Sequence, residues 1–395
     1  MIFSISILSV FFFIFFCFLI LEKRKHSESL LRIPIRIHVN GTRGKSSVTR
    51  LIHSILVEAG WNAFAKTTGS APSLLFPDRS EKRIFRNKIS ISEQIAFLNF
   101  ISPKKAQGVV AVVVECMAVQ PEYQKDSERL LLKATHTVIT NVRPDHGEYA
   151  DSQGKILEGF LHTVPTNGTI VYGRSLEDLD WRSFTSGKNT EPALGVPNIS
   201  EESIQKIASS MRYAEHKENI EIAASVCEIL GIEESVILRG ISKTVPDCGA
   251  LRTEEFSLNE TKQRFIFAFA ANDIISWEKI YRSFRDRFPS ERVNVVFNSK
   301  KERPVRTVEF ASFFSKISDL DNIYFFGPGY GIFSSAYKGN GKLIRKRTSD
   351  DIQWNWNIQK SQIWIGAGNY EGEGRGWLEN QCALLSKVRD EEWKS

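Results

Sequence analysis

The chain has 395 residues, of which 42% are hydrophobic and 25% are charged. These proportions are ordinary for folded proteins, so they exclude a generally disordered chain and leave room for two or three domains with substantial cores. The net charge of +6, from 52 basic and 46 acidic residues, is too small to argue by itself for a nucleic-acid partner.

The first segment, residues 1–21, is almost wholly apolar and is followed by the charged run EKRKH at residues 22–26. About 20 apolar residues are enough for a helix to span a bilayer. A cleavable signal peptide would carry positive charge before the apolar stretch and a small-residue cleavage site after it, and this segment has neither. We therefore predict an uncleaved, single-pass membrane anchor that also contacts anionic lipid. The basic residues on its C-terminal side place the rest of the chain in the cytoplasm.

A short glycine loop follows, between a predicted strand and a predicted helix. Residues 33–39 alternate between apolar and polar side chains, which is the period of a strand with one buried face. Residues 48–59 carry apolar side chains at helical spacing, and Gly60 ends the helix. The loop between them reads NGTRGKSS at residues 40–47. Its backbone N–H groups and the dipole of the following helix predict a cradle for phosphate.

The loop also supplies two side chains that suit a nucleotide. In a P-loop, the lysine after the last glycine reaches the β- and γ-phosphates and the next hydroxyl binds Mg²⁺, which assigns these roles to Lys45 and Ser46. Only two residues separate Gly41 from Gly44, so the loop is shorter than the usual P-loop. The alternative is a glycine turn without a ligand, and the strand before the loop and the helix after it argue against it.

The rest of the first half predicts alternating strands and helices. The apolar run Val109–Val114 indicates a strand that is buried on both faces. Residues 174–200 are rich in Ser, Asp, Pro and Asn and are predicted to be an irregular loop. Further elements are predicted by periodicity: strands at 137–140 and 169–172, and helices at 204–211 and 219–230. Strands that alternate with helices imply a parallel sheet covered by helices on both sides.

The turn at residues 246–250 predicts a domain boundary, because a second α/β pattern follows it. Strand-like runs in that part of the chain lie at 265–269, 293–297, 323–326 and 363–365. The predicted domains are an anchor over 1–21, a central domain over 22–245 and a C-terminal domain over 246–395. The five cysteines are scattered without metal-binding spacing, which is typical of reduced thiols in the cytosol.

Polar side chains follow two of the predicted central strands. Glu115 comes directly after the apolar run, and the stretch TNVRPDH at 140–146 brings Asp145 and His146 to the same edge of a parallel sheet. Ligands bind at this edge in open α/β sheets, and a carboxylate there suits Mg²⁺ that bridges ATP phosphates. Each group alone has an ordinary alternative, such as a solvated strand end or a hydrogen-bonded histidine. Together with the glycine loop they predict a metal–nucleotide site.

These stretches resemble the Mur ligase superfamily. The resemblance lies in the glycine loop, in ECMAVQPE at 115–122 and in TNVRPDH at 140–146, and it continues in PDCGALR at 246–252 and AFAAND at 268–273. With the N-terminal segment, they resemble more narrowly the ligase-subunit family of poly-γ-glutamate synthases, the PgsB/CapB family. The resemblance implies a Mur-ligase-like P-loop ATPase domain with a parallel sheet, and a second, smaller α/β domain.

The resemblance also implies roles for residues of the first domain. Asn219 would meet adenine, while Ser46, Glu115 and His146 would hold Mg²⁺. The triphosphate would be bound by the loop residues Gly41, Thr42, Arg43, Gly44, Lys45, Ser46 and Ser47.

In the second domain, the resemblance implies that Arg252 and Asp273 close over the phosphates and the ribose. Catalysis would be carried by Lys45, Glu115, His146 and Arg252. Ordinary alternatives stay open for three of the implied residues: an N-cap for Asn219, a surface ion pair for Arg252 and a turn for Asp273.

The implied activity is ATP- and Mg²⁺-dependent amide ligation, in which the γ-carboxylate of glutamate is activated as an acyl phosphate and coupled to an amine. The substrates would be glutamate and the growing poly-γ-glutamate chain, and membrane partners would complete a synthase and export complex. No nucleic acid is expected. Two alternatives remain: a Mur-type ligase that adds an amino acid to another acceptor, and a membrane-associated P-loop ATPase without ligase activity.

A basic run lies near the C-terminus and consists of Lys342, Arg345, Lys346 and Arg347. One interpretation is that these residues hold the polyanionic product. The other is a solvated loop or strand face, and the sequence leaves both open.

Overall fold

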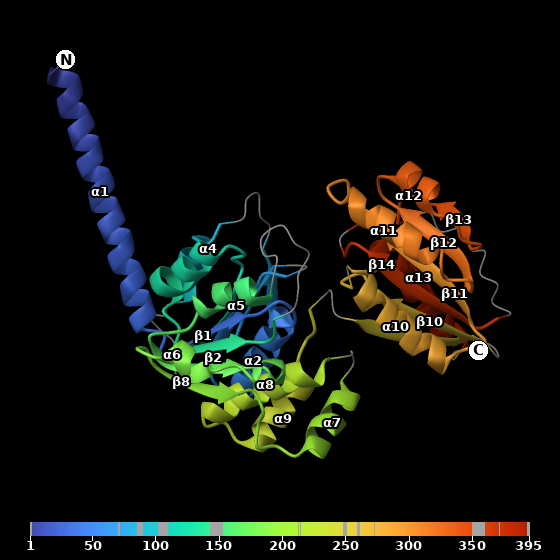
Figure 1. Ribbon diagram of the computed structural model, residues 1–395, viewed down its shortest axis with the longest axis horizontal. Coiled ribbons are helices and arrows are strands. Elements are labelled where there is room, and N and C mark those ends of the chain that lie inside the picture. The colour runs from blue at the N-terminus through green and yellow to red at the C-terminus, as the bar shows by residue number, and fades with distance from the viewer. Residues whose placement is uncertain are drawn as a thin grey trace. The chain divides into compact units, whose positions relative to one another are not determined.

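The computed structural model describes residues 2–69, 72–84, 90–101, 110–142, 153–211, 213, 215–247, 251–258, 261–271, 273–349, 360–370 and 372–392. The chain divides into two compact units. Unit 1 comprises Met1–Met211 with Glu215–Asp247, and unit 2 comprises Arg212–Ala214 with Cys248–Ser395. Each unit is built around its own sheet (Figure 1).

Helix α1 (Ile2–Leu31) precedes the first strand, and its last turn packs on the rest of unit 1. Leu30 is buried in a cluster with side chains of α3 (Glu93–Ile101). Among the residues whose placement the structure describes, no helix is both long enough and apolar enough to cross a membrane. The transmembrane anchor predicted over residues 1–21 is therefore not confirmed.

The sheet of unit 1 has eight strands in the order β4-β3-β2-β5-β1-β6-β7-β8. All neighbours pair in parallel except β3, which pairs antiparallel with β2 and β4. The strands are β1 (Ile35–Asn40), β2 (Asn62–Thr67), β3 (Ser73–Leu75), β4 (Glu81–Arg83), β5 (Val110–Glu115), β6 (His136–Ile139), β7 (Asn167–Tyr172) and β8 (Asn189–Leu194). Every residue of β5 is buried, which confirms the strand predicted from the apolar run.

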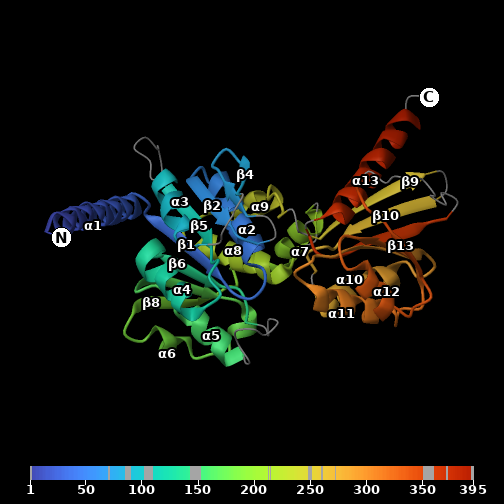
Figure 2. The ribbon, with the colours of Figure 1, turned by 90° about the horizontal axis from the view of Figure 1, so that it is seen from above.

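Helices cover both faces of this sheet, as the alternating pattern predicts (Figure 2). On one face, α2, α8 and α9 share a core with Ile37 and Val113. On the other face, α3 packs on Val112 and α5 packs on Ile139. The helices are α2 (Lys45–Glu58), α4 (Pro121–Asp126), α5 (Gln153–Leu161), α6 (Trp181–Thr185), α7 (Glu201–Ser210), α8 (Lys217–Ile229) and α9 (Glu234–Ser242), with a π-helix η1 (Ser127–Leu132) and a 3₁₀-helix η2 (Arg174–Leu176).

The prediction of an irregular loop over residues 174–200 is wrong, because this segment contains η2, α6 and the edge strand β8. Pro192, one of the residues whose composition suggested a loop, lies inside β8. An edge strand tolerates proline, since one of its sides needs no ladder partner. The buried ring of Trp181 stacks on Tyr172 at 4.5 Å between centroids and ties the segment to the sheet.

Unit 2 has a six-stranded sheet in the order β13-β12-β11-β14-β10-β9, parallel except for β9. Its strands are β9 (Arg252–Leu258), β10 (Thr261–Phe267), β11 (Arg292–Asn298), β12 (Leu320–Phe326), β13 (Lys342–Arg345) and β14 (Gln362–Gly368). Its helices are α10 (Ile274–Arg287), α11 (Pro304–Phe314), α12 (Tyr330–Ala336) and α13 (Glu373–Glu392). Figure 2 shows α13 on one face of the sheet and the other three helices on the opposite face. All four strands predicted for this part of the chain are confirmed.

Candidate active site

The glycine loop connects β1 to α2, and both of its glycines have backbone conformations that favour glycine. Gly41 has φ of 131° and Gly44 has φ of 82°. A Cβ atom at Gly41 would come within 2.1 Å of the hydroxyl oxygen of Thr140, and one at Gly44 within 2.4 Å of Oδ1 of Asn219. The loop therefore needs glycine for its backbone shape and for its close approach to two other segments.

The first N–H groups of the loop bind protein atoms. The N–H of Gly41 donates to Oδ1 of Asn40 at 2.8 Å. Those of Thr42 and Arg43 donate to the carbonyl and side-chain oxygens of Asn141, at 3.0 and 3.1 Å. These bonds hold the loop against the end of β6. The N-cap of α2 is Gly44, which has no side chain to cap the helix, so the N–H groups of its first turn are available to an anion.

The side chain of Lys45 lies on this loop. Its ammonium group donates to the carbonyl oxygens of Gly41, at 2.5 Å, and Thr42, at 3.2 Å. The positive charge is thus held next to the first turn of α2. A phosphate bound there would meet backbone donors and a cation together.

Ser46 and Glu115 come from different elements and meet at the carboxyl edge of the sheet. The hydroxyl of Ser46 donates to Oε2 of Glu115 at 2.9 Å, and the N–H of Thr68 donates to the same oxygen at 2.6 Å. Glu115 is only 3% exposed. A hydroxyl and a carboxylate are hard oxygen donors of the kind that Mg²⁺ prefers, so this pair fits one side of a magnesium site.

The third predicted metal ligand, His146, lies outside the described residues, as do Arg143 and Asp145. Within the described part of the chain, no group of three or more His, Cys, Asp or Glu side chains gathers in a way that could hold a metal ion. Of the three predicted metal ligands, the described structure therefore shows two, Ser46 and Glu115, in contact with each other.

Asn219 lies in the first turn of α8 and is 6% exposed. The N-cap of α8 is His216, so the N-cap interpretation of Asn219 is wrong. Its side-chain amide instead packs against Gly44 and donates to Oε1 of Glu215 at 2.7 Å. The family resemblance thus indicated a residue that the fold brings to the glycine loop.

Glu215 is a member of this cluster that the sequence analysis missed. Burial raises the pKa of its carboxyl group, against the opposing effect of hydrogen bonds from Asn219, the backbone of His216 and Ser47. The carboxyl group therefore connects the beginning of α8 to the beginning of α2. An acidic residue just before a helix is so common that its position alone carries no signal.

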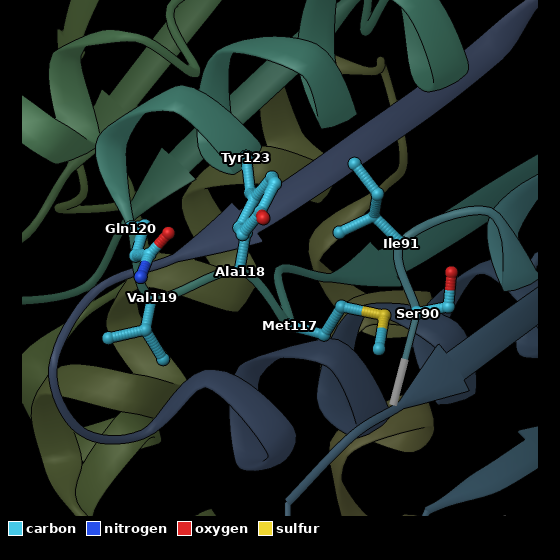
Figure 3. A pocket seen from close by; sticks show the side chains of 7 residues that line it. All are labelled: Ser90, Ile91, Met117, Ala118, Val119, Gln120 and Tyr123. Carbon is cyan, nitrogen blue, oxygen red and sulfur yellow. The ribbon is translucent and has the colours of Figure 1, made fainter. Parts of the chain in front are cut away.

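A pocket of about 430 Å³ opens beside the end of β5 (Figure 3). Its lining is mainly apolar and includes the hydroxyl groups of Ser90 and Tyr123 and the amide of Gln120. Figure 3 shows Met117 next to the segment that carries Ser90 and Ile91, with Gln120 and Tyr123 at the beginning of α4. The stretch that carries the resemblance at 115–122 therefore forms one wall of a pocket large enough for a small molecule.

A buried histidine in β1, the strand before the glycine loop, pairs with a glutamate. His38, in β1, is fully buried, and its Nδ1 lies 2.9 Å from Oε2 of Glu128 in η1. Burial by itself lowers the pKa of His38, but the neighbouring Cys116 and the Glu128 carboxylate outweigh it and raise the pKa to about 10. His38 is therefore a buried imidazolium that pairs with Glu128 near neutral pH.

This pair predicts that the stability of the protein depends on pH. The pKa of histidine in an unfolded chain is about 6.5. The stabilising effect of His38 is thus complete below pH 6.5 and is lost as the pH rises toward about 10. We expect the free energy of unfolding to fall over this window by up to about 1.4 kcal/mol per pH unit. Denaturant unfolding at a series of pH values measures this change in the free energy of unfolding.

The control is Glu128→Gln, which removes the carboxylate that, together with Cys116, raises the pKa of His38. The variant should be less stable at pH 6.5, and its stability should depend less on pH up to about 10 than that of the original chain. An identical pH dependence in the two proteins would contradict the ion pair.

The two predicted site residues of unit 2 make contacts within that unit. Nε of Arg252 lies 3.0 Å from Oε1 of Glu254, and its guanidinium lies over the ring of Phe267 at 4.1 Å. The carboxylate of Asp273 accepts a hydrogen bond of 2.8 Å from the N–H of Ser276 and caps α10. The ion pair that was the ordinary alternative for Arg252 is thus present, and Asp273 is a helix N-cap where the ordinary alternative was a turn residue.

Comparison with known protein families gives two matches along the chain. Residues 39–223 match the Mur ligase middle domain, and residues 253–381 match the poly-gamma-glutamate synthase CapB C-terminal domain. The first match begins near the end of β1 and lies mainly in unit 1, and the second begins in β9 and lies in unit 2.

Two curated relatives are similar over nearly the whole chain. The capsule biosynthesis protein CapB of Bacillus anthracis is 34% identical over 386 residues, which cover 94% of this chain and 81% of that protein. The PGA synthase CapB of Bacillus subtilis (strain 168) is 29% identical over 374 residues, which cover 91% and 93% of the two chains.

Solved structures show the same fold at lower identity. The folylpolyglutamate synthase of Thermotoga maritima has a TM-score of 0.60 at 13% identity, over 90% of this chain and 93% of that one. MurF of Acinetobacter baumannii has a TM-score of 0.55 at 12% identity, over 93% and 79%. A third similar structure, the bifunctional folylpolyglutamate synthase/dihydrofolate synthase of Yersinia pestis, was solved with AMPPNP and a manganese ion.

Proposed function

Because the chain belongs to the CapB family of poly-γ-glutamate synthases, within the Mur ligase superfamily, we infer that it is an ATP-dependent amide ligase that builds poly-γ-glutamate. The observation that carries this conclusion is the glycine loop that holds Lys45 beside the Ser46–Glu115 pair. The residue roles, the metal and the location of the protein are proposals that build on it.

The chemistry follows from the difficulty of making an amide from a carboxylate. A carboxylate is a poor acyl donor because its leaving group would be oxide. Transfer of the γ-phosphoryl group of ATP to the glutamate γ-carboxylate gives an acyl phosphate and ADP. An amine then attacks the acyl carbon, so that phosphate leaves and the amine loses a proton. The product is an amide, with one ATP consumed for each bond formed.

We assign the handling of charge in this transfer to the loop. Phosphoryl transfer depends mainly on positioning and on neutralising the phosphate oxygens. The first-turn N–H groups of α2 and the ammonium of Lys45 would do both. Ser46 and Glu115, with His146, would hold Mg²⁺, which when bound supplies further positive charge to the phosphates. The manganese in a structurally similar synthase supports a divalent cation in general.

The other proposed contacts surround this centre. Asn219 would meet the adenine of ATP, and Arg252 and Asp273 would close over the phosphates and the ribose. The pocket beside β5 would receive the end of the substrate that carries the carboxylate, because its wall continues directly from Glu115. Its volume of about 430 Å³ is within the range of pockets that bind small molecules.

We propose that the protein acts at the cell membrane with both units on the cytoplasmic side. Large apolar side chains from Val10 to Leu21 of α1 are exposed, and Lys23, Arg24 and Lys25 follow them. Apolar side chains beside basic ones favour contact with an anionic membrane surface. Membrane partners of a synthase and export complex would act there too.

Deletion of residues 1–21 should abolish co-sedimentation with anionic vesicles, and retained binding would contradict the proposal.

One experiment separates the ligase from its alternatives. Membranes that contain the full chain are incubated with ATP, Mg²⁺ and labelled glutamate, and both ADP release and polymer are measured. A poly-γ-glutamate ligase should release ADP only when glutamate is present and should accumulate a labelled polymer. A Mur-type ligase for another acceptor would add single residues, and a P-loop ATPase without ligase activity would release ADP without glutamate.

A further inference from the structure

A row of cations lies at the carboxyl edge of the sheet in unit 2. Lys301 and Arg303 follow β11, Arg345 ends β13 and Arg347 lies two residues beyond it. All four side chains are exposed. We call these four residues the cationic edge.

Strand pairing brings the two halves of the cationic edge together. β11 pairs in parallel with β12, and β12 pairs in parallel with β13, as Figure 1 shows. Asn298 at the end of β11 is opposite Phe326, and Arg345 is opposite Phe325. Neighbouring strands are about 4.8 Å apart, so the ends of β11 and β13 are separated by only about 10 Å. Long basic side chains from the segments at these two strand ends can therefore bind one extended ligand.

Backbone hydrogen bonds hold the segments at this edge. The N–H of Ser299 donates to the carbonyl oxygen of Phe326 at 2.9 Å, and the N–H of Lys346 donates to that of Phe325 at 2.9 Å. The guanidinium of Arg345 lies 5.1 Å from the ring centroid of Tyr330 at the beginning of α12. The two basic segments are thus fixed to the sheet on both sides of β12.

The charges of the cationic edge differ from several others in unit 2, which form ion pairs. Arg264, Arg285 and Arg292 each form an ion pair with a carboxylate. The four residues of the cationic edge form no ion pair with any residue in the described ranges. The connection between β11 and α11 also contains one acidic residue, Glu302. Like charges gathered without counter-charges repel one another, so an anionic ligand would be favoured there.

We propose that the cationic edge binds the growing poly-γ-glutamate chain and retains it between successive additions. This inference rests on the proposed function, which supplies the polymer. Each γ-linked residue keeps one free carboxylate, so the product carries a negative charge at every repeat. A guanidinium can bind a carboxylate through two parallel hydrogen bonds, and several such contacts along one chain add up. A chain that is retained in this way is extended further before it dissociates.

The test removes the four charges and compares the result with a matched control. The edge variant is K301Q/R303Q/R345Q/R347Q in the full chain. The control variant, R287Q/K316Q/K338Q/K360Q, removes four exposed positive charges that end or follow helices or precede a strand, and hence lie toward the opposite edge of the same sheet. Binding of pre-formed poly-γ-glutamate of defined length is measured at low and high salt, and the length of newly made chains is measured on gels.

We expect the edge variant to bind the polymer at least about tenfold more weakly than the original chain, since each lost exposed contact is worth a few-fold. Its products should be shorter, and raised salt should reduce binding by the original chain. The control variant should behave like the original chain. If the edge variant fails to fold, R345Q/R347Q alone should show the same changes to a smaller degree.

Equal binding by all three proteins would overturn the inference, whatever the synthesis assay shows. Weaker binding by both variants would also overturn it, because the effect would then come from net charge rather than from this edge. Binding of pre-formed polymer needs no turnover. Absence of polymer synthesis by the original chain would therefore count against the proposed function, while the binding comparison still decides the cationic edge.

Discussion

Replacement of Lys45 by alanine is expected to lower glutamate-dependent ATP turnover by a factor of about 10²–10³, the usual effect of removing one group that stabilises charge in a transition state. The ammonium of Lys45 touches only the carbonyl oxygens of its own loop among its described hydrogen bonds. Its loss therefore removes a cation from the phosphate site and little from the core. ADP release, measured with and without glutamate, gives the change.

The matched control for this variant is Lys206→Ala, which removes an exposed lysine from α7 in the same unit. It should leave turnover unchanged. Thermal melting should show that Lys45→Ala is folded, because the glycine conformations and the Asn141 hydrogen bonds that shape the loop are unaffected. Near-normal turnover by a folded Lys45→Ala protein would mean that the nucleotide binds elsewhere.

Glu115→Gln is expected to weaken the binding of Mg²⁺ that turnover requires. The side chain keeps its size but loses the charge that makes it a ligand for a hard cation. Even indirect partners of metal ligands are worth about 10–100-fold in metal affinity, so a direct ligand should be worth at least that much. The concentration of Mg²⁺ that supports half-maximal turnover should therefore rise, and high Mg²⁺ should restore part of the activity.

Ser46→Ala tests whether the two residues serve one cation. The hydroxyl of Ser46 and the carboxylate of Glu115 are 2.9 Å apart, so their effects on one ion should not add. The double variant should be little worse than the poorer single variant. Glu122→Gln, which changes an exposed carboxylate in the same stretch, is the control. Fully additive losses would show that Ser46 and Glu115 act on different steps.

Much of the fold could be predicted because its signals are local. The alternation before the glycine loop and the helical spacing after it correctly predicted β1 and α2. The continuous apolar run correctly predicted β5, since a strand that is buried on both faces consists mainly of apolar side chains. The same local logic failed for β8, where Pro192 suggested a loop and only pairing with β7 makes the segment a strand.

The candidate site could be predicted in part. The short glycine loop and the residue that follows each central strand indicated a metal–nucleotide site, and the structure brings Ser46 to Glu115 and Asn219 to Gly44. Glu215 and the His38–Glu128 pair could not be recognised, because single acidic and histidine residues have no periodic pattern. Their importance arises from burial, which is a property of the packed chain.

By itself, the sequence determined the elements and the chemical groups that this ligase has available. Glycines at 41 and 44, a lysine and a serine at the start of a helix and a glutamate at the end of an apolar strand are local facts. The tertiary structure decided which of these groups meet. Strand order places the end of β5 beside the loop after β1, and it places Lys301 and Arg303 near Arg345 and Arg347. Such contacts depend on how the sheets and helices bury their apolar faces together, so no single stretch of sequence contains them.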